Sequence, residues 1–166
     1  MKSLVELLNE STFIPADYES ISASLNLFLD SVLKNKKYDI PEEDYRGGAI
    51  LSIPGEELSK DISEISYKNF RIPDFKKLLK PVLDKMNEFG YEYVIRKEKP
   101  NSVRDRSPYP EDRIFFDGSV FVLFYPKGSM WDYSNRLDII FRFGQDENIS
   151  KLDIKIGKNI YDEFSR

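Results

Sequence analysis

The chain has 166 residues, a net charge of −4, and no cysteine or histidine. The missing thiols and imidazoles exclude disulfides, Cys/His zinc sites, cysteine nucleophiles and histidine acid–base catalysis. With 40% hydrophobic and 33% charged residues, the composition is that of a soluble globular protein. We find no apolar run near the ~18 residues of a membrane span and no signal-peptide pattern. We therefore expect a cytoplasmic protein of a bacterium or phage-infected cell, with no membrane contact.

The charge is uneven along the chain. Residues 1–66 hold 6 basic and 13 acidic side chains, whereas residues 67–113 hold 12 basic and 8 acidic ones. The overall acidic balance argues against general duplex nucleic-acid binding, which needs a concentrated basic surface, but it leaves room for a local basic site. An acidic surface can instead mimic the charge of nucleic acid and bind a basic, nucleic-acid-processing protein.

The N-terminal half of the chain predicts helices. Ser3 and Glu6 form a capping box, which predicts a short helix to about Asn9. A longer helix is predicted over about 16–35, where apolar residues recur at spacings of three and four. These residues are Tyr18, Ile21, Leu25, Phe28, Leu29, Val32 and Leu33.

Glycine and proline divide the next segment into short elements. A strand is predicted over 47–54 and one helical turn near 61–64. A third helix is predicted over about 73–89, because Pro73 suits a first turn and Gly90 a position just past the end. An interior proline removes a helical hydrogen bond, so we expect a kink or break at Pro81.

From residue 91 the apolar period changes from 3.6 to 2, which predicts strands. The expected elements are strands over 91–97, 113–116, 119–125, 136–143 and 152–156, a hairpin turn or bulge at Asp117-Gly118, and a helix over 159–164. We expect one α+β domain over residues 1–166, helical over about 1–90 and sheet-rich over about 91–166. Its antiparallel sheet should have about four to five strands, with two or three helices on one face.

Asp138, Asp153 and Lys155 are the strongest catalytic candidates. They have the outline of a restriction-type nuclease site, in which two carboxylates hold Mg²⁺ and a lysine assists the attacking water. Strand alternation places Asp153 and Lys155 on the same side. A solvated sheet face gives the same pattern, because opposite charges pair across strands. We favour the solvated face, predict no metal or cofactor, and keep the Mg²⁺-dependent nuclease as the alternative.

Two loops carry the candidate binding residues. One is the polar loop between the first two C-terminal strands, where arginine alternates with tyrosine and suits an acidic partner. The other, 125–133, holds the only tryptophan beside two tyrosines, residue types that anchor protein interfaces. The candidates are Arg104, Arg106, Tyr109, Arg113, Trp131 and Tyr133. The plainer alternatives are a self-neutralising solvated loop, and a tryptophan that folds back as a lid on the core.

Because no catalytic motif is present, we predict a non-enzymatic protein that acts by binding another protein. An inhibitor, an immunity or anti-defence factor, and a phage-particle assembly component all fit this prediction. A third hypothesis is single-stranded nucleic-acid binding through Tyr91, Tyr93 and Arg96, together with the arginine-bearing loop.

Overall fold

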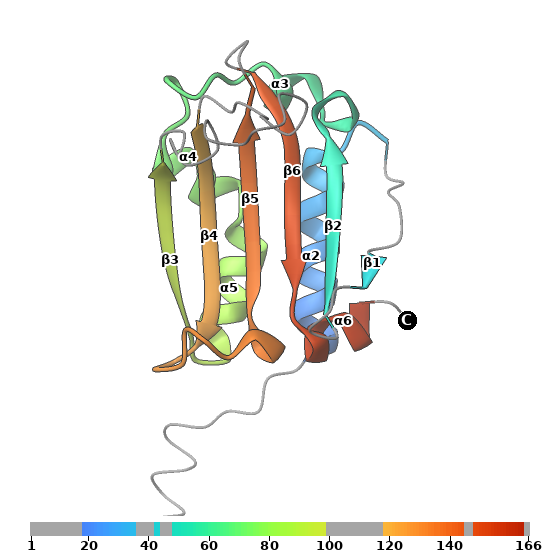
Figure 1. Cartoon of the computed structure of the whole chain (residues 1–166), viewed down its shortest axis with the longest axis vertical. Coiled ribbons are helices and arrows are strands. Elements are labelled where there is room, and N and C mark those ends of the chain that lie inside the picture. Colours follow the sequence, from blue (N-terminus) through green and yellow to red (C-terminus); the bar gives the residue numbers. More distant parts are fainter. Residues whose placement is uncertain (1–17, 36–41, 44–47, 99–117, 145–147, 165–166) are drawn as a thin grey trace, which may run out of the picture.

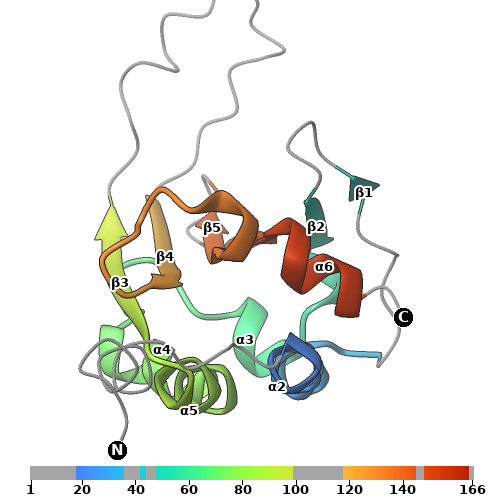
Figure 2. The ribbon, with the colours of Figure 1, turned by 90° about the horizontal axis from the view of Figure 1, so that it is seen from below.

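The computed structural model describes residues 18–35, 42–43, 48–98, 118–144 and 148–164. In this part of the chain, six antiparallel strands form one sheet in the order β1-β2-β6-β5-β4-β3, and helices pack on one of its faces (Figures 1 and 2). The strands are β1 (Glu42–Glu43), β2 (Ala49–Pro54), β3 (Tyr91–Glu98), β4 (Gly118–Pro126), β5 (Leu137–Phe143) and β6 (Ile149–Ile156). The helical elements are α2 (Tyr18–Val32), η1 (Gly55–Glu57), α3 (Lys60–Ser63), α4 (Ile72–Leu78), α5 (Lys80–Glu88), η4 (Tyr133–Asn135) and α6 (Lys158–Phe164). The predicted α+β architecture, with most strands in the C-terminal half, is confirmed.

Helix α2 follows its apolar spacing. Its buried side chains point to the sheet and to neighbouring helices, and include Ile21, Leu25, Phe28, Leu29 and Val32. Beyond the helix, Leu33 pairs with Leu58, which fixes the end of α2 to the segment after β2. The helix predicted over 3–9 lies outside the described residues. Within the described residues, no helix is long and apolar enough to cross a membrane.

The helix predicted over 73–89 is broken in two, as Pro81 predicts. Helix α4 ends at Leu78 and α5 begins at Lys80, so Pro81 falls in the first turn of α5. A first-turn residue needs no intrahelical N–H bond, so the break places the proline without losing one. Gly90 follows α5 with a φ of 76°, a conformation that favours glycine.

The face of the sheet under the helices is the hydrophobic core. Along β5, alternate side chains from Leu137 to Phe143 are fully buried, as the period-2 pattern predicts. Phe141 packs against three rings, with centroid distances of 5.7 Å to Phe70, 5.5 Å to Phe75 and 6.5 Å to Phe28. These contacts join α2, α4 and the segment before α4 to the centre of the sheet.

The other face of the sheet, which we call the open face, carries no helix among the described residues (Figure 2). Strand register places Leu123 between Val94 and Asp138, and Phe121 between Arg96 and Ile140. The side chains of Val94, Phe121, Leu123 and Ile140 are half-buried there. The open face is therefore partly apolar.

One local prediction needs correction. Gly118 is the first residue of β4, opposite Phe143, and not part of a turn. A Cβ at this position would lie 2.3 Å from the ring of Tyr67 and 2.7 Å from the carbonyl oxygen of Glu98. Glycine is needed here because an aromatic ring packs against the strand backbone. Asp117 and the strand predicted over 113–116 lie outside the described residues.

Replacing a phenylalanine with alanine should cost more unfolding free energy on the core face of the sheet than on the open face. Phe141→Ala should lower the free energy of unfolding by about 3–5 kcal/mol, because it empties the centre of the aromatic core. Phe121→Ala, on the open face of the neighbouring strand, should cost only roughly 1–2 kcal/mol. Urea unfolding followed by circular dichroism measures both. Equal losses would contradict the assignment of the two faces.

Candidate functional site

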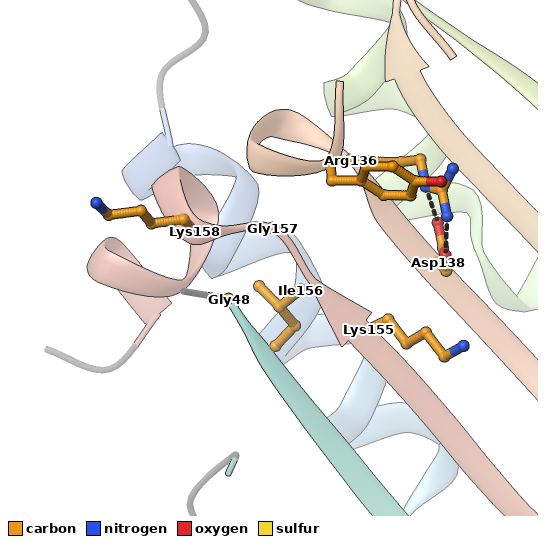
Figure 3. A pocket seen from close by; sticks show the side chains of 8 residues that line it. Gly48, Arg136, Asp138, Lys155, Ile156, Gly157 and Lys158 are labelled. Atoms are coloured by element: carbon orange, nitrogen blue, oxygen red, sulfur yellow. Dashed lines mark hydrogen bonds and ion pairs between the residues drawn. The ribbon is translucent and has the colours of Figure 1, made fainter. Parts of the chain in front are cut away.

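A pocket of about 70 Å³ lies where β2 and β5 begin and β6 ends (Figure 3). It is lined by Gly48, Tyr133, Arg136, Asp138, Lys155, Ile156, Gly157 and Lys158. Pockets for drug-sized ligands measure about 300–1,000 Å³, so this one has room only for a small polar group. Three of the lining residues are cations and one is an acid, which makes the pocket basic in a chain that is acidic overall.

Arg136 forms the rigid wall of the pocket. Its Nε lies 3.0 Å from Asp138 Oδ1, and its Nη2 donates to Oδ2 at 3.0 Å. Its Nη1 donates to the carbonyl of Met130 at 3.2 Å, and its guanidinium lies 4.3 Å from the centroid of the Tyr133 ring. Two-point contact with a carboxylate and stacking on an aromatic ring hold an arginine in one orientation. All three guanidinium nitrogens therefore have partners inside the protein.

The loop between β4 and β5 brings the two predicted aromatic residues to this wall. The ring centroids of Trp131 and Tyr133 lie 6.2 Å apart with the rings tilted by 57°, so Trp131, Tyr133 and Arg136 form a continuous row of contacts, which we call the aromatic stack. Trp131 is 73% exposed, and the alternative in which it covers the core is wrong. Backbone hydrogen bonds at Ser129, Asp132 and Tyr133 hold the loop in shape. The tryptophan is thus presented to solvent from an ordered turn.

A half-buried polar network fixes the loop to the rest of the fold. The side-chain oxygen of Asn135 accepts hydrogen bonds from Tyr18 of α2 and from Asn159 of α6, and its amide donates to Asp132 at 2.8 Å. The amide of Gly157 donates to the carbonyl of Arg136 at 2.8 Å. A Cβ on Gly157 would lie 2.5 Å from the carbonyl oxygen of Tyr133, so only glycine permits this close packing.

The pKa of a neighbouring tyrosine reflects the same network. Burial raises the pKa of Tyr91 far above its usual value, and the nearby Tyr18 and Asp132 raise it further. Tyr91 therefore stays neutral throughout the physiological pH range and acts here as a structural group.

Asp153 lies on the open face of β6, opposite Ile140 of β5 on one side and Ser52 of β2 on the other. It accepts hydrogen bonds from Arg142 Nε at 2.7 Å and from Ser52 Oγ at 2.7 Å, and Lys151 Nζ lies 3.5 Å away. Burial raises the pKa of Asp153, but the hydrogen bonds from Arg142 and Ser52 and the charges of Lys151 and Arg142 outweigh burial and lower it overall. The carboxylate is consequently ionised and fully partnered.

The three residues of the nuclease alternative do share the open face. Asp138 lies directly opposite Lys155, whereas Asp153 lies opposite Ile140. Each carboxylate contacts an arginine, so a metal ion would have to displace both arginines before it could bind the two acids. No group of three or more acidic side chains in the described part of the chain is placed to hold a metal ion. The arrangement matches the paired charges of a polar sheet face.

The remaining predicted site residues belong to the segment between β3 and β4. Arg104, Arg106, Tyr109 and Arg113 lie outside the described residues. The strand ends that flank their segment, Glu98 and Gly118, lie at the end of the sheet opposite to the pocket (Figure 1). The nucleic-acid hypothesis loses its common surface, because Tyr91 and Tyr93 alternate with Arg96 and face the other side of β3.

Sequence reasoning missed Arg136 and Lys158 as site residues. The alternation of Arg136 and Asp138 was a usable signal, because residues two apart on a strand share a face. The chain turn that places Lys158 beside the pocket depends on the contact between Gly157 and the β4–β5 loop, which joins segments distant in sequence.

The chain matches no protein-family model, and no curated protein or solved structure is significantly similar to it. Its function is therefore inferred from the side chains of the site.

The lowered pKa of Asp153 predicts a pH-dependent contribution to stability. Asp153→Asn should lower the free energy of unfolding by about 1–3 kcal/mol at pH 7, because Arg142 loses its ionised partner. The folded-state pKa lies below the usual value of about 4, so this stabilisation is complete above that value and disappears as pH falls through the folded pKa. Urea unfolding at pH 7, 5 and 3 measures the difference in unfolding free energy between wild type and variant, which should become smaller as the pH falls.

The matched control is Asp84→Asn, which breaks an exposed ion pair with Lys80 on α5. Exposed pairs contribute little, so this variant should unfold like wild type at every pH. If the Asp153→Asn deficit were as large at pH 3 as at pH 7, it would come from lost packing and not from the carboxylate charge.

Proposed function

We propose that the protein binds another protein without catalysing a reaction, and that the stack of Trp131, Tyr133 and Arg136 is its main contact. The observation that carries this proposal is the 73% exposure of Trp131 on an ordered loop. Interface hot spots are enriched in tryptophan, tyrosine and arginine, and these three residue types stand here in one row. An inhibitor, an immunity or anti-defence factor, or a phage-particle assembly component would each use such a contact.

Rigidity supports this role. A large ring held on an ordered turn loses little conformational freedom when it binds, so more of the gain from burying it remains as affinity. The stack is fixed at one end by the ion pair of Arg136 with Asp138. An aromatic side chain that only completed the fold would be buried against the core, as Phe141 is.

The neighbouring open face enlarges the contact surface. Asp138 of the pocket lies opposite Leu123, and Leu123 lies next to the half-buried side chains of Val94, Phe121 and Ile140. A protein partner suits this combination of apolar side chains and a charged border, because interfaces have an apolar centre and a polar rim. The pocket and the open face therefore form one continuous surface for the same partner.

Photo-crosslinking in cells of the natural host tests the proposal. With the crosslinker benzoylphenylalanine at position 131, we expect one discrete adduct with another protein. The matched control places it at position 27, where Leu27 is also exposed, at 59%, but on α2 at the helical side of the molecule. Adducts from position 27 and none from position 131 would contradict the proposed site, and none from either position would contradict partner binding.

Alanine substitution then measures the contribution of the tryptophan. Trp131→Ala should weaken binding of the captured partner by about 2 kcal/mol or more, the usual cost of removing a hot-spot ring. Because Trp131 is exposed, the free energy of unfolding should stay within about 0.5 kcal/mol of wild type. Calorimetric titration and urea unfolding provide the two measurements. A variant that binds with unchanged affinity would remove Trp131 from the contact.

A further inference from the structure

We infer that the partner presents an acidic segment to this site, with carboxylates that pair with Lys155 and Lys158; this inference rests on the proposed function. Lys155 lies near the end of β6, Lys158 is the first residue of α6, and both line the pocket. Both are exposed, and neither has a hydrogen bond or ion pair to another described residue. Within the described part of the chain, no acidic side chain therefore neutralises either ammonium group.

The direction of the two side chains favours an extended ligand. In Figure 3 the amino groups of Lys155 and Lys158 extend to opposite sides of the pocket. Lys151 continues the row along the open face of β6, with 38% of its side chain exposed, although it shares Asp153 with Arg142. We call Lys151, Lys155 and Lys158 the basic strip. A segment with several carboxylates along its length can meet successive charges of such a strip, whereas a single small anion meets one.

The donors that remain favour carboxylates over phosphate. Phosphate sites use arginine forks and convergent backbone amides. Here the arginine fork of Arg136 holds Asp138, and the amide of Gly157 donates to the carbonyl of Arg136. The negative charge of Asp138 at the pocket wall also disfavours a doubly charged anion. Lysine ammonium groups on flexible stems remain, and they pair readily with carboxylates.

This inference reverses the charge of the partner expected from composition. The chain carries a net charge of −4, which suggests a basic partner, but Tyr133, the neighbour of the exposed tryptophan, lines the same pocket as Lys155 and Lys158. Local charge decides recognition, because screening limits charge interactions to about 10 Å at 0.1 M salt.

Titration with a synthetic peptide of ten glutamates at low salt tests the inference, and ¹H–¹⁵N NMR spectra record the binding. We expect saturable shifts at the amides of residues 155–158 and at the indole N–H of Trp131. Lys155→Gln/Lys158→Gln should weaken this binding about fivefold or more. The matched control, Lys34→Gln/Lys77→Gln, removes two exposed charges elsewhere, at the end of α2 and in α4, and should bind like wild type.

Three results would overturn the inference: no shifts at 155–158, equal weakening in both double variants, or shifts produced by inorganic phosphate and not by the peptide. The last result would assign the pocket to phosphate. Failure of the peptide together with a specific adduct at position 131 would overturn the acidic partner and leave the proposed function standing. Peptide binding without any adduct at position 131 would overturn the proposed function, and the acidic protein partner with it.

Discussion

The register between β5 and β6 places Leu137 opposite Ile156 and Asp138 opposite Lys155. Because side chains alternate along a strand, this one alignment sends the aliphatic and aromatic residues of both strands into the core and the charged residues to the open face. A shift of β5 by one residue would expose the Phe141 side of the strand, turn Asp138 into the core and separate Arg142 from Asp153 of β6. The same alignment brings the end of β6 beside the start of β5, where the pocket forms. The core and the candidate site thus depend on a single pairing.

The two aspartates of the open face show how the packing of a sheet can produce a pattern that resembles a catalytic site. Asp138 and Asp153 are nearly buried, and an unpaired buried carboxylate would be strongly destabilising. Each aspartate contacts an arginine on the same face. Asp138 contacts Arg136, two residues earlier in the chain, and Asp153 contacts Arg142 on the neighbouring strand β5. Such pairs add little net stability compared with apolar residues, but the pair of Arg142 on β5 with Asp153 on β6 penalises every register in which these partners separate. This pairing accounts for Asp153 in the acid-x-lysine pattern of β6, whereas Lys155 forms no ion pair with a described residue.

Local patterns in the sequence predicted most of the fold. The spacing in α2, the break at Pro81 and the alternation in β5 each depend on residues within one element, so a short window contains the information. Gly118 was misread because its reason is the ring of Tyr67, which approaches from a distant segment. For Trp131 a short window left both a surface contact and a lid on the core open, because only the geometry of the β4–β5 loop turns this ring outward. The stack with Tyr133 and Arg136 likewise depends on the turn of that loop.

The molecule combines an acidic overall charge with a basic strip that runs along β6 to the pocket. In the proposed complex, an acidic segment of the partner would be attracted to Lys155 and Lys158, so charge would orient the encounter before contact. Tyr133 lines the same pocket and its ring lies 6.2 Å from the exposed ring of Trp131, so apolar area would be available next to the charged contact. The half-buried network at Asn135 links the two parts of the surface, because it fixes the loop that carries Trp131 to the helix that begins at Lys158.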